Sequence, residues 1–195
     1  MWEGFSMREE VLRVFIAIEI KDQDVLRNLI RIRDLIASSG ADVKPVEDEN
    51  IHLTLRFIGE VPVSVVEEVC NVLANLKHSR FEMHVKGVGV FPTIHRPRVV
   101  WAGIAEGSSE LIELHNMVER ELHRLRVPAD REEFTPHITL LRVKSGKGVD
   151  KLVKLIEEFK DADFGATPVE RIVLKKSTLT PRGPIYTDMC YKSLD

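Results

Sequence analysis

Two short segments combine the alternation of a half-buried strand with the same pair of polar residues. In IHLTLRFIG (51–59), apolar positions alternate with His52, Thr54 and an arginine. In PHITLLR (136–142), His137 and Thr139 occupy the corresponding places. Alternation with a period of two predicts a strand that has one buried and one polar face. Because side chains two residues apart share a face, each strand should present a histidine and a threonine together.

The rest of the pattern predicts strands and helices in mixed order. Helical spacing of apolar residues and suitable first-turn residues indicate helices at 24–38, 62–78, 108–125 and 149–159. Dense or alternating apolar runs indicate further strands at 11–20, 81–91, 98–104, 169–179 and 185–191. Each half of the chain therefore combines strands with helices.

The order of elements repeats with a nearly constant displacement. His52 and His137 are 85 residues apart, and so are Thr54 and Thr139. The same displacement lays VFIA (14–17) onto VVWA (99–102). A repeat of this kind indicates an internal duplication.

The duplication predicts one two-lobed domain over residues 1–195 with pseudo-two-fold symmetry. The expected repeat halves are 11–91 and 97–180, a terminal strand at 185–191 completes a sheet begun by the other lobe, and residues 1–6 are an extension. No low-complexity segment or long linker separates the halves.

Composition restricts the classes of function. The 195 residues are 44% apolar and 30% charged, as in an ordinary globular protein, and the net charge of -3 excludes a polycation. Contact with nucleic acid would therefore need a local basic patch.

Cys70 and Cys190 have no partner at metal-ligand spacing, so we expect them to be small core residues in a reducing compartment. No apolar run approaches transmembrane length, and the N-terminus has no signal-like apolar region. We therefore expect a cytoplasmic, metal-free protein.

A pseudo-two-fold axis would bring the two His-x-Thr strands face to face around one small volume. Two histidines can serve as general acid and general base near neutral pH, on opposite sides of a phosphate. Threonine hydroxyls can donate to its non-bridging oxygens. A single histidine on a strand is more often structural, and we interpret His78, His84, His115 and His123 in this way. For His52 and His137, that interpretation would have to explain the same pair of residues twice.

Other candidate residues have two interpretations each. Arg56 alternates in phase with the first histidine, whereas Arg142 lies five residues after His137 and faces away in a straight strand. A bulge or the end of the strand would turn Arg142 towards the cleft. Phe134 could stack on a base or sugar, or pack in the core. The segment 175–186 could form a basic rim for a phosphate-bearing chain or a soluble hairpin tip.

The paired segments HLTL and HITL resemble the signature of the 2H phosphoesterase superfamily. The surrounding segments FIAIEI, FIGEV, GVGVFP, PRVVWAGI, FTPHITLLRVK and STLTPRGPIY extend the likeness over residues 11–191. Together they resemble the RNA 2',3'-cyclic phosphodiesterase group, historically called 2'-5' RNA ligase. A single His-x-Thr motif carries no information, whereas this ordered set is specific.

The resemblance implies a two-lobed α+β fold, in which two antiparallel sheets line a central cleft and the helices lie on the outside. It also implies hydrolysis of RNA 2',3'-cyclic phosphate ends to 2'-phosphomonoesters, with His52 as proton donor and His137 as proton acceptor. Thr54 and Thr139, with Arg142 and Phe134 as further candidates, would bind substrate. The residues alone leave the order of the two histidines open, because the site is nearly symmetric.

The expected partner is RNA with a 2',3'-cyclic end, tRNA fragments included, and the expected protein is a monomer without cofactor or membrane contact. The same displacement with a ribose hydroxyl in place of water would join RNA ends through a 2'-5' bond. Two alternatives remain open: a phosphodiesterase for small cyclic nucleotides or nucleotide sugars, and an RNA-end-binding module without catalysis.

Overall fold

The computed structural model describes residues 8–195, so the expected extension at 1–6 lies outside the described part of the chain. Its strands are β1 (Val11–Glu19), β2 (Val43–Pro45), β3 (His52–Pro62), β4 (Phe81–Thr93), β5 (Arg96–Ile104), β6 (His137–Val143), β7 (Asp163–Val169), β8 (Arg171–Thr180) and β9 (Gly183–Ser193). Its helices are α1 (Gln23–Ala37), α2 (Val63–Ala74), α3 (Ser108–Arg124) and α4 (Val149–Glu158), with a 3₁₀ turn η1 (Asp48–Asn50).

All the predicted strands and helices are present, and the α+β class is confirmed. Helix α1 shows why the pattern predicted them. The Asp22 side chain accepts a hydrogen bond from the Val25 amide at its start, and Val25, Leu29, Ile32 and Ile36 form its buried face. The sequence did not indicate β2, which has three residues, or β7. Strand β7 contains a glycine and a proline, and it lies at the edge of the sheet, where proline is tolerated.

The strands form one curled antiparallel sheet instead of two separate ones. Their order is β7-β4-β5-β6-β3-β1-β8-β9, and β2 pairs with β6. The two halves of the sheet meet in the middle of this order, where β3 pairs with β6 through Leu53 and Ile138. These residues are themselves 85 positions apart. The pseudo-two-fold axis therefore passes through this pair.

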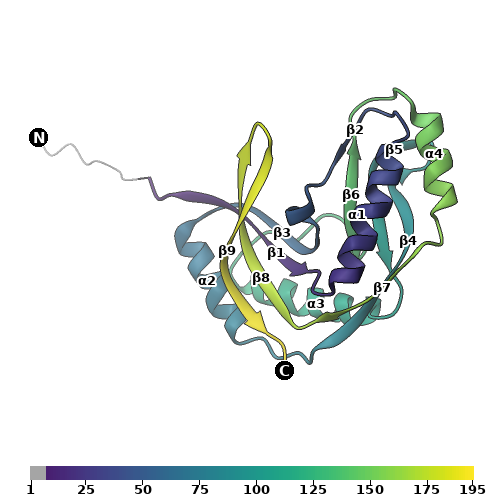
Figure 1. Ribbon diagram of the computed structural model, residues 1–195. Helices are drawn as coiled ribbons and strands as arrows, with labels where there is room; N and C mark the ends of the chain where they lie inside the picture. The colour runs from purple at the N-terminus through teal and green to yellow at the C-terminus, as the bar shows by residue number, and fades with distance from the viewer. Residues whose placement is uncertain (1–7) are drawn as a thin grey trace, which may run out of the picture.

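The two halves of the sequence exchange elements in space (Figure 1). Strand β4 belongs to the first half but pairs with β5, and β8 from the second half pairs with β1. Helix α1 contacts β6, β7 and α4, whereas α3 contacts β3 and α2. Each end of the sheet therefore contains strands from both halves of the sequence. The domain boundaries inferred from the repeat stay a prediction.

The strand pairing corrects the alignment of the first strands of the repeat by one residue. Ala17 lies opposite Thr54 in β1 and β3, and Trp101 lies opposite Thr139 in β5 and β6. Ala17 and Trp101 are 84 residues apart, not 85. The difference matters because a slip of one residue moves a strand's side chains to the opposite face. Trp101 thereby reaches the face that carries the two histidines.

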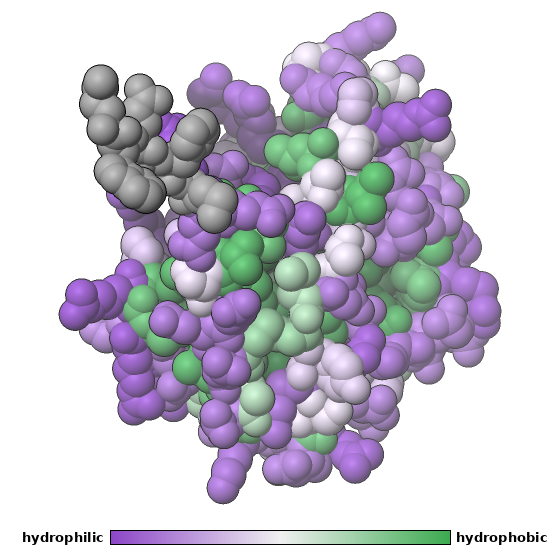
Figure 2. Space-filling model, turned by 90° about the vertical axis from the view of Figure 1, so that its left-hand side faces the viewer, coloured by the Kyte–Doolittle hydropathy of each residue, from purple (hydrophilic) through white to green (hydrophobic). Residues whose placement is uncertain are grey.

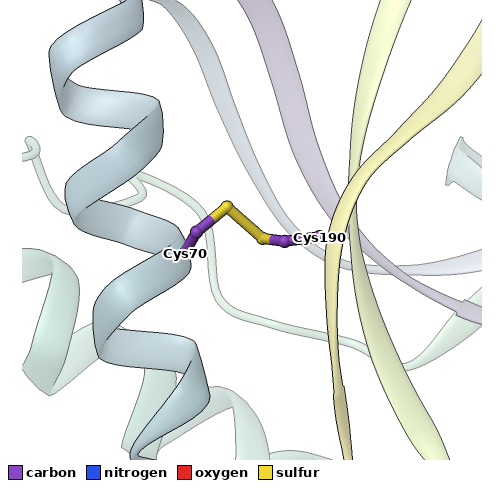
Figure 3. The surroundings of a disulfide bond; sticks show 2 residues. All are labelled: Cys70 and Cys190. Carbon is purple, nitrogen blue, oxygen red and sulfur yellow. A yellow bond between two sulfur atoms is a disulfide. The ribbon is translucent and has the colours of Figure 1, made fainter.

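The expectation that the two cysteines are free is wrong. Cys70 on α2 and Cys190 on β9 form a disulfide with an S–S distance of 2.14 Å across 120 residues of sequence (Figure 3). Helix α2 packs on β9, which brings the two Cα atoms to 6.0 Å. Disulfides persist in oxidising compartments and inside hyperthermophiles. The cysteine content therefore does not support the predicted reducing compartment.

The outer side of the molecule around α2 and β9 is largely hydrophilic, with hydrophobic side chains gathered near the middle of the view (Figure 2). Strand β9 is an edge strand and exposes Ile185, Met189 and Tyr191. Within residues 8–195, no helix is both long enough and apolar enough to cross a bilayer.

Candidate active site

A cavity of about 540 Å³ lies on the polar face of β3 and β6. His52, Thr54, His137 and Thr139 all line it. Leu53 and Ile138, which pair at the centre, are fully buried and point towards the core. Their neighbours on either side therefore point into the cavity. Because the strands are antiparallel, this register places each histidine beside the threonine of the other strand.

The two imidazole rings are held in the same way. Nδ1 of His52 donates to the Asn50 carbonyl, and Nδ1 of His137 donates to the Thr135 carbonyl, both at 2.6 Å. A carbonyl only accepts, so the proton of each neutral ring lies on Nδ1, and Nε2 is the basic nitrogen. Nε2 of His52 lies 2.8 Å from the Thr54 hydroxyl, which donates to it in the neutral form.

Aromatic side chains form the walls around both histidines. Phe15 and Tyr186 lie 5.1 and 5.4 Å from the His52 ring, centroid to centroid. Phe91 lies edge-on to His137 at 4.9 Å, and Trp101 lies 6.2 Å away. The sequence singled out the segments that carry these residues, but the alternation alone did not assign them a role beside the histidines.

Burial lowers the pKa of both histidines below the ordinary value of 6.5. For His52, the Asn50 carbonyl opposes this effect, whereas the positive charge of Lys175 and the neighbouring His137 lower the pKa further. For His137, the Thr135 carbonyl opposes burial and the Arg142 charge adds to it. These shifts favour the neutral form of both rings. A bound phosphate anion favours the imidazolium form of either ring.

A bulge turns Arg142 towards the cavity. Leu141 pairs with Val100, and Thr139 pairs with Trp101, so Leu140 is the extra residue. Arg142 then lies on the same face as Thr139 and lines the cavity. Lys44 on β2 pairs with Arg142 and lines the cavity as well. Together they place two cations beside the second His-x-Thr segment.

The expectation that Arg56 shares the face of the first histidine is wrong, and a second bulge explains it. Ala17 pairs with Thr54 and Ile16 with Arg56, so Leu55 is extra and the alternation reverses. Arg56 is buried on the other side, where it bonds to Glu119 and to the Pro128 carbonyl.

Phe57 takes the place that Arg56 was expected to occupy in the cavity. The guanidinium of Arg13 lies 4.7 Å above the centroid of its ring and also lines the cavity. Phe57 occupies the repeat position of Arg142. At this repeat position the first half of the site carries a phenyl ring beneath Arg13, whereas the second half carries the guanidinium of Arg142 itself.

Phe134 does not line the cavity. Its ring stacks on His115 at 4.2 Å and packs against the core. His115 itself is buried, although the helical pattern places it on the polar side. The structure thus supports the core-packing alternative for Phe134.

The segment 175–186 forms the β8–β9 hairpin, and only part of it reaches the cavity. The hairpin residues on the wall are Ser177, Leu179, Gly183, Pro184 and Tyr186. Lys175 is bound to Asp188 at 2.7 Å, and it lies 3.6 Å from Glu19. Lys176 and Arg182 are not on the wall, so the predicted basic rim is not formed by this hairpin.

One family of known proteins matches this chain twice. The family described as LigT like Phosphoesterase matches residues 18–101 and again residues 103–186. The chain belongs to this family. The two matches are displaced by 85 residues, as the His-x-Thr segments are.

Named relatives and solved structures of this family cover most of the chain. An RNA 2',3'-cyclic phosphodiesterase of Aeropyrum pernix is 46% identical over 81% of this chain and 90% of its own length. One of Methanothermobacter thermautotrophicus is 37% identical over 91% of this chain and 96% of its own. The crystal structure of E. coli LigT with 3'-AMP has a TM-score of 0.78 at 25% identity, covering 95% and 99% of the two chains. The crystal structure of a Thermus thermophilus protein has a TM-score of 0.78 at 29% identity, covering 93% and 97%.

Proposed function

We propose that this LigT-like phosphoesterase hydrolyses RNA 2',3'-cyclic phosphate ends to 2'-phosphomonoesters. The observation that carries the proposal is a single cavity lined by two histidines of identical tautomer, each next to a threonine. The named activity of relatives up to 46% identical supports the substrate class. Within residues 8–195, His, Cys, Asp and Glu side chains form no group of three placed to bind a metal ion. The proposed reaction uses the protein's own acid and base.

In the proposed reaction, water attacks phosphorus and the bond from phosphorus to the 3'-oxygen breaks. Nε2 of His137 takes the proton from water, and the imidazolium of His52 gives its Nε2 proton to the 3'-oxygen. One feature supports this order. Among the described residues, Nε2 of His137 has no hydrogen-bond partner, whereas Nε2 of His52 is bonded to the Thr54 hydroxyl. If a ribose hydroxyl of a second RNA end attacks in place of water, the same displacement joins the two RNA ends through a 2'-5' bond.

The phosphate oxygens are bound by neutral and charged donors. Thr54 and Thr139 supply hydroxyls, and Arg142 and Lys44 supply positive charge on one side of the cavity. Burial raises the pKa of the Tyr186 phenol, which keeps its proton and provides another donor on the cavity wall.

The test is release of 2'-phosphate from an oligonucleotide that ends in a 2',3'-cyclic phosphate. We expect His52→Ala and His137→Ala each to lower kcat by a factor on the order of 10² to 10⁴. His123→Ala changes an exposed histidine on α3 and is the matched control. Activity should survive a chelator and should follow a bell-shaped pH dependence. Near-normal activity of either cavity variant would sink the proposal.

Small cyclic nucleotides are a second candidate substrate, because a cavity of about 540 Å³ is within the range of small-ligand sites. Equal kcat/KM on a cyclic mononucleotide and on an oligonucleotide would favour this candidate. Tight binding of a cyclic end without any product would instead favour a binding module.

We further propose that the physiological substrates are cleaved RNAs such as tRNA fragments, and that the protein acts in the cytoplasm as a monomer without membrane contact. Light scattering after size exclusion tests the oligomeric state. Sequencing of RNAs whose cyclic ends accumulate when the protein is removed tests the substrate.

A further inference from the structure

A second hollow of about 480 Å³ lies between the start of β5 and the end of β6, the strand that carries His137 and Thr139. Its walls come from the β4–β5 turn, the β5 start and the loop before α4. We call it the cationic groove. Its charged and titratable residues are His95, Arg96, Arg98 and Lys144, and no Asp or Glu among the described residues lines it.

The cations of the groove are free to bind an anion. Arg96, Arg98 and Lys144 are exposed, and none of them forms an ion pair within residues 8–195. By contrast, Arg33, Arg56, Arg171 and Lys175 are all bound to carboxylates. In a chain whose net charge is -3, three uncompensated cations around one hollow form a local positive patch.

The groove begins at the end of β6 that carries Arg142, although none of the described residues lines both hollows. Lys144 follows Arg142 by two residues, a distance of about 6.6 Å along an extended strand. Val99 pairs with Arg142 and shares its face, so Arg98 lies at the same end of β6 but on the opposite face of the sheet. An RNA strand that passes Arg142 therefore crosses the end of β6 to reach Arg98. The opposite side of the cavity carries Phe57 and Leu179, which are exposed apolar side chains suited to a base.

Building on the proposed function, we propose that the cationic groove binds internucleotide phosphates of the RNA strand whose cyclic end occupies the cavity. The strand then leaves the site past Arg142 towards Lys144, Arg98 and Arg96. This placement makes the protein an enzyme for oligonucleotide ends. A mononucleotide fills the cavity but leaves the groove empty.

The test compares two substrates with one variant. The triple variant Arg96→Ala, Arg98→Ala, Lys144→Ala should raise KM for a cyclic-phosphate-ended oligonucleotide at least ten-fold and leave kcat unchanged. For a 2',3'-cyclic mononucleotide, both constants should stay unchanged. The control triple variant Lys77→Ala, Arg120→Ala, Lys160→Ala removes three exposed cations elsewhere and should leave both substrates unaffected.

Binding without turnover separates this proposal from the proposed function. Fluorescence anisotropy with a labelled single-stranded RNA is measured on His52→Ala, with and without the groove changes, over a range of salt. Each lost phosphate contact should reduce the salt slope by about 0.7, so the groove variant should lose about 2. An unchanged slope and affinity would overturn the groove, whatever the catalytic result. Loss of mononucleotide hydrolysis in the groove variant would also overturn it.

Discussion

At the scale of single residues, the candidate site depends on how each histidine ring is oriented. A carbonyl two residues earlier fixes each Nδ1, so the backbone just before each strand, and not a side-chain carboxylate, sets the tautomer. Asn50 adds a second link. Its side-chain amide donates to the Pro184 carbonyl at 2.9 Å, while its own carbonyl accepts from His52. The β8–β9 hairpin and the first histidine are therefore positioned together.

Lys175 gives a test of the electrostatics around His52. Its ammonium lies between Asp188 and Glu19, and its charge lowers the pKa of His52. Replacing it in Lys175→Met removes a positive charge and leaves Asp188 without its ion pair, whereas Glu19 stays bound to Arg171. The lost positive charge and the freed carboxylate both favour the imidazolium. We therefore expect the pKa of His52 to rise towards its ordinary value. One limb of the bell-shaped pH–rate profile should then move to higher pH.

The neighbouring lysine provides the control for this shift. Lys176→Met removes the same charge one residue further along β8, and Lys176 does not perturb His52. Its pH–rate profile should match that of the wild type. Equal shifts in the two variants would show that only overall charge matters.

At the scale of elements, period and spacing revealed the four helices and every strand except β2 and β7, but not the bulges within strands. The alternation of IHLTLRF places Arg56 with His52, and only the extra Leu55 in the pairing reverses it. The same signal leaves Arg142 ambiguous until Leu140 is seen to be extra. A bulge depends on the partner strand, so it is invisible in the sequence of one strand. The histidines and threonines were predictable because they lie at the central pair, before either bulge.

The disulfide is another tertiary feature that spacing did not reveal, and it yields a prediction about stability. Cys70 and Cys190 close a loop of 120 residues between α2 and β9. Chain-entropy estimates give about 4–5 kcal/mol for a loop of this size. We expect Cys70→Ser, Cys190→Ser to lower the free energy of unfolding by up to that amount, measured by guanidinium denaturation.

Activity and reductant complete the test of the disulfide. Neither cysteine lines the cavity, so kcat at room temperature should be unchanged. Wild-type protein in reductant should approach the stability of the double variant, whereas the double variant should not respond to reductant. Equal stability of the wild type with and without reductant would contradict the prediction.

At the scale of the whole molecule, duplication in sequence does not produce two independent units. Each end of the sheet takes strands from both halves, and α1 packs on strands of the second half. The repeat predicted the symmetry and the position of the site on the axis. The exchange of β4 and β8 was not predictable, because both topologies have the same order of elements along the chain.

This exchange predicts that the first half does not fold alone. A fragment of residues 8–94 ends in the turn after β4, and it lacks β5 and β7, the two strands that pair with β4. It also lacks β6, on which α1 packs. In the fragment, β4 and α1 would expose the apolar surface that these missing strands cover. The fragment should therefore give poorly dispersed NMR spectra and no cooperative thermal transition. Mixing it with residues 95–195 should restore dispersion and the cavity that needs both histidines. A fragment that unfolds cooperatively by itself would show that the exchange is not required for folding.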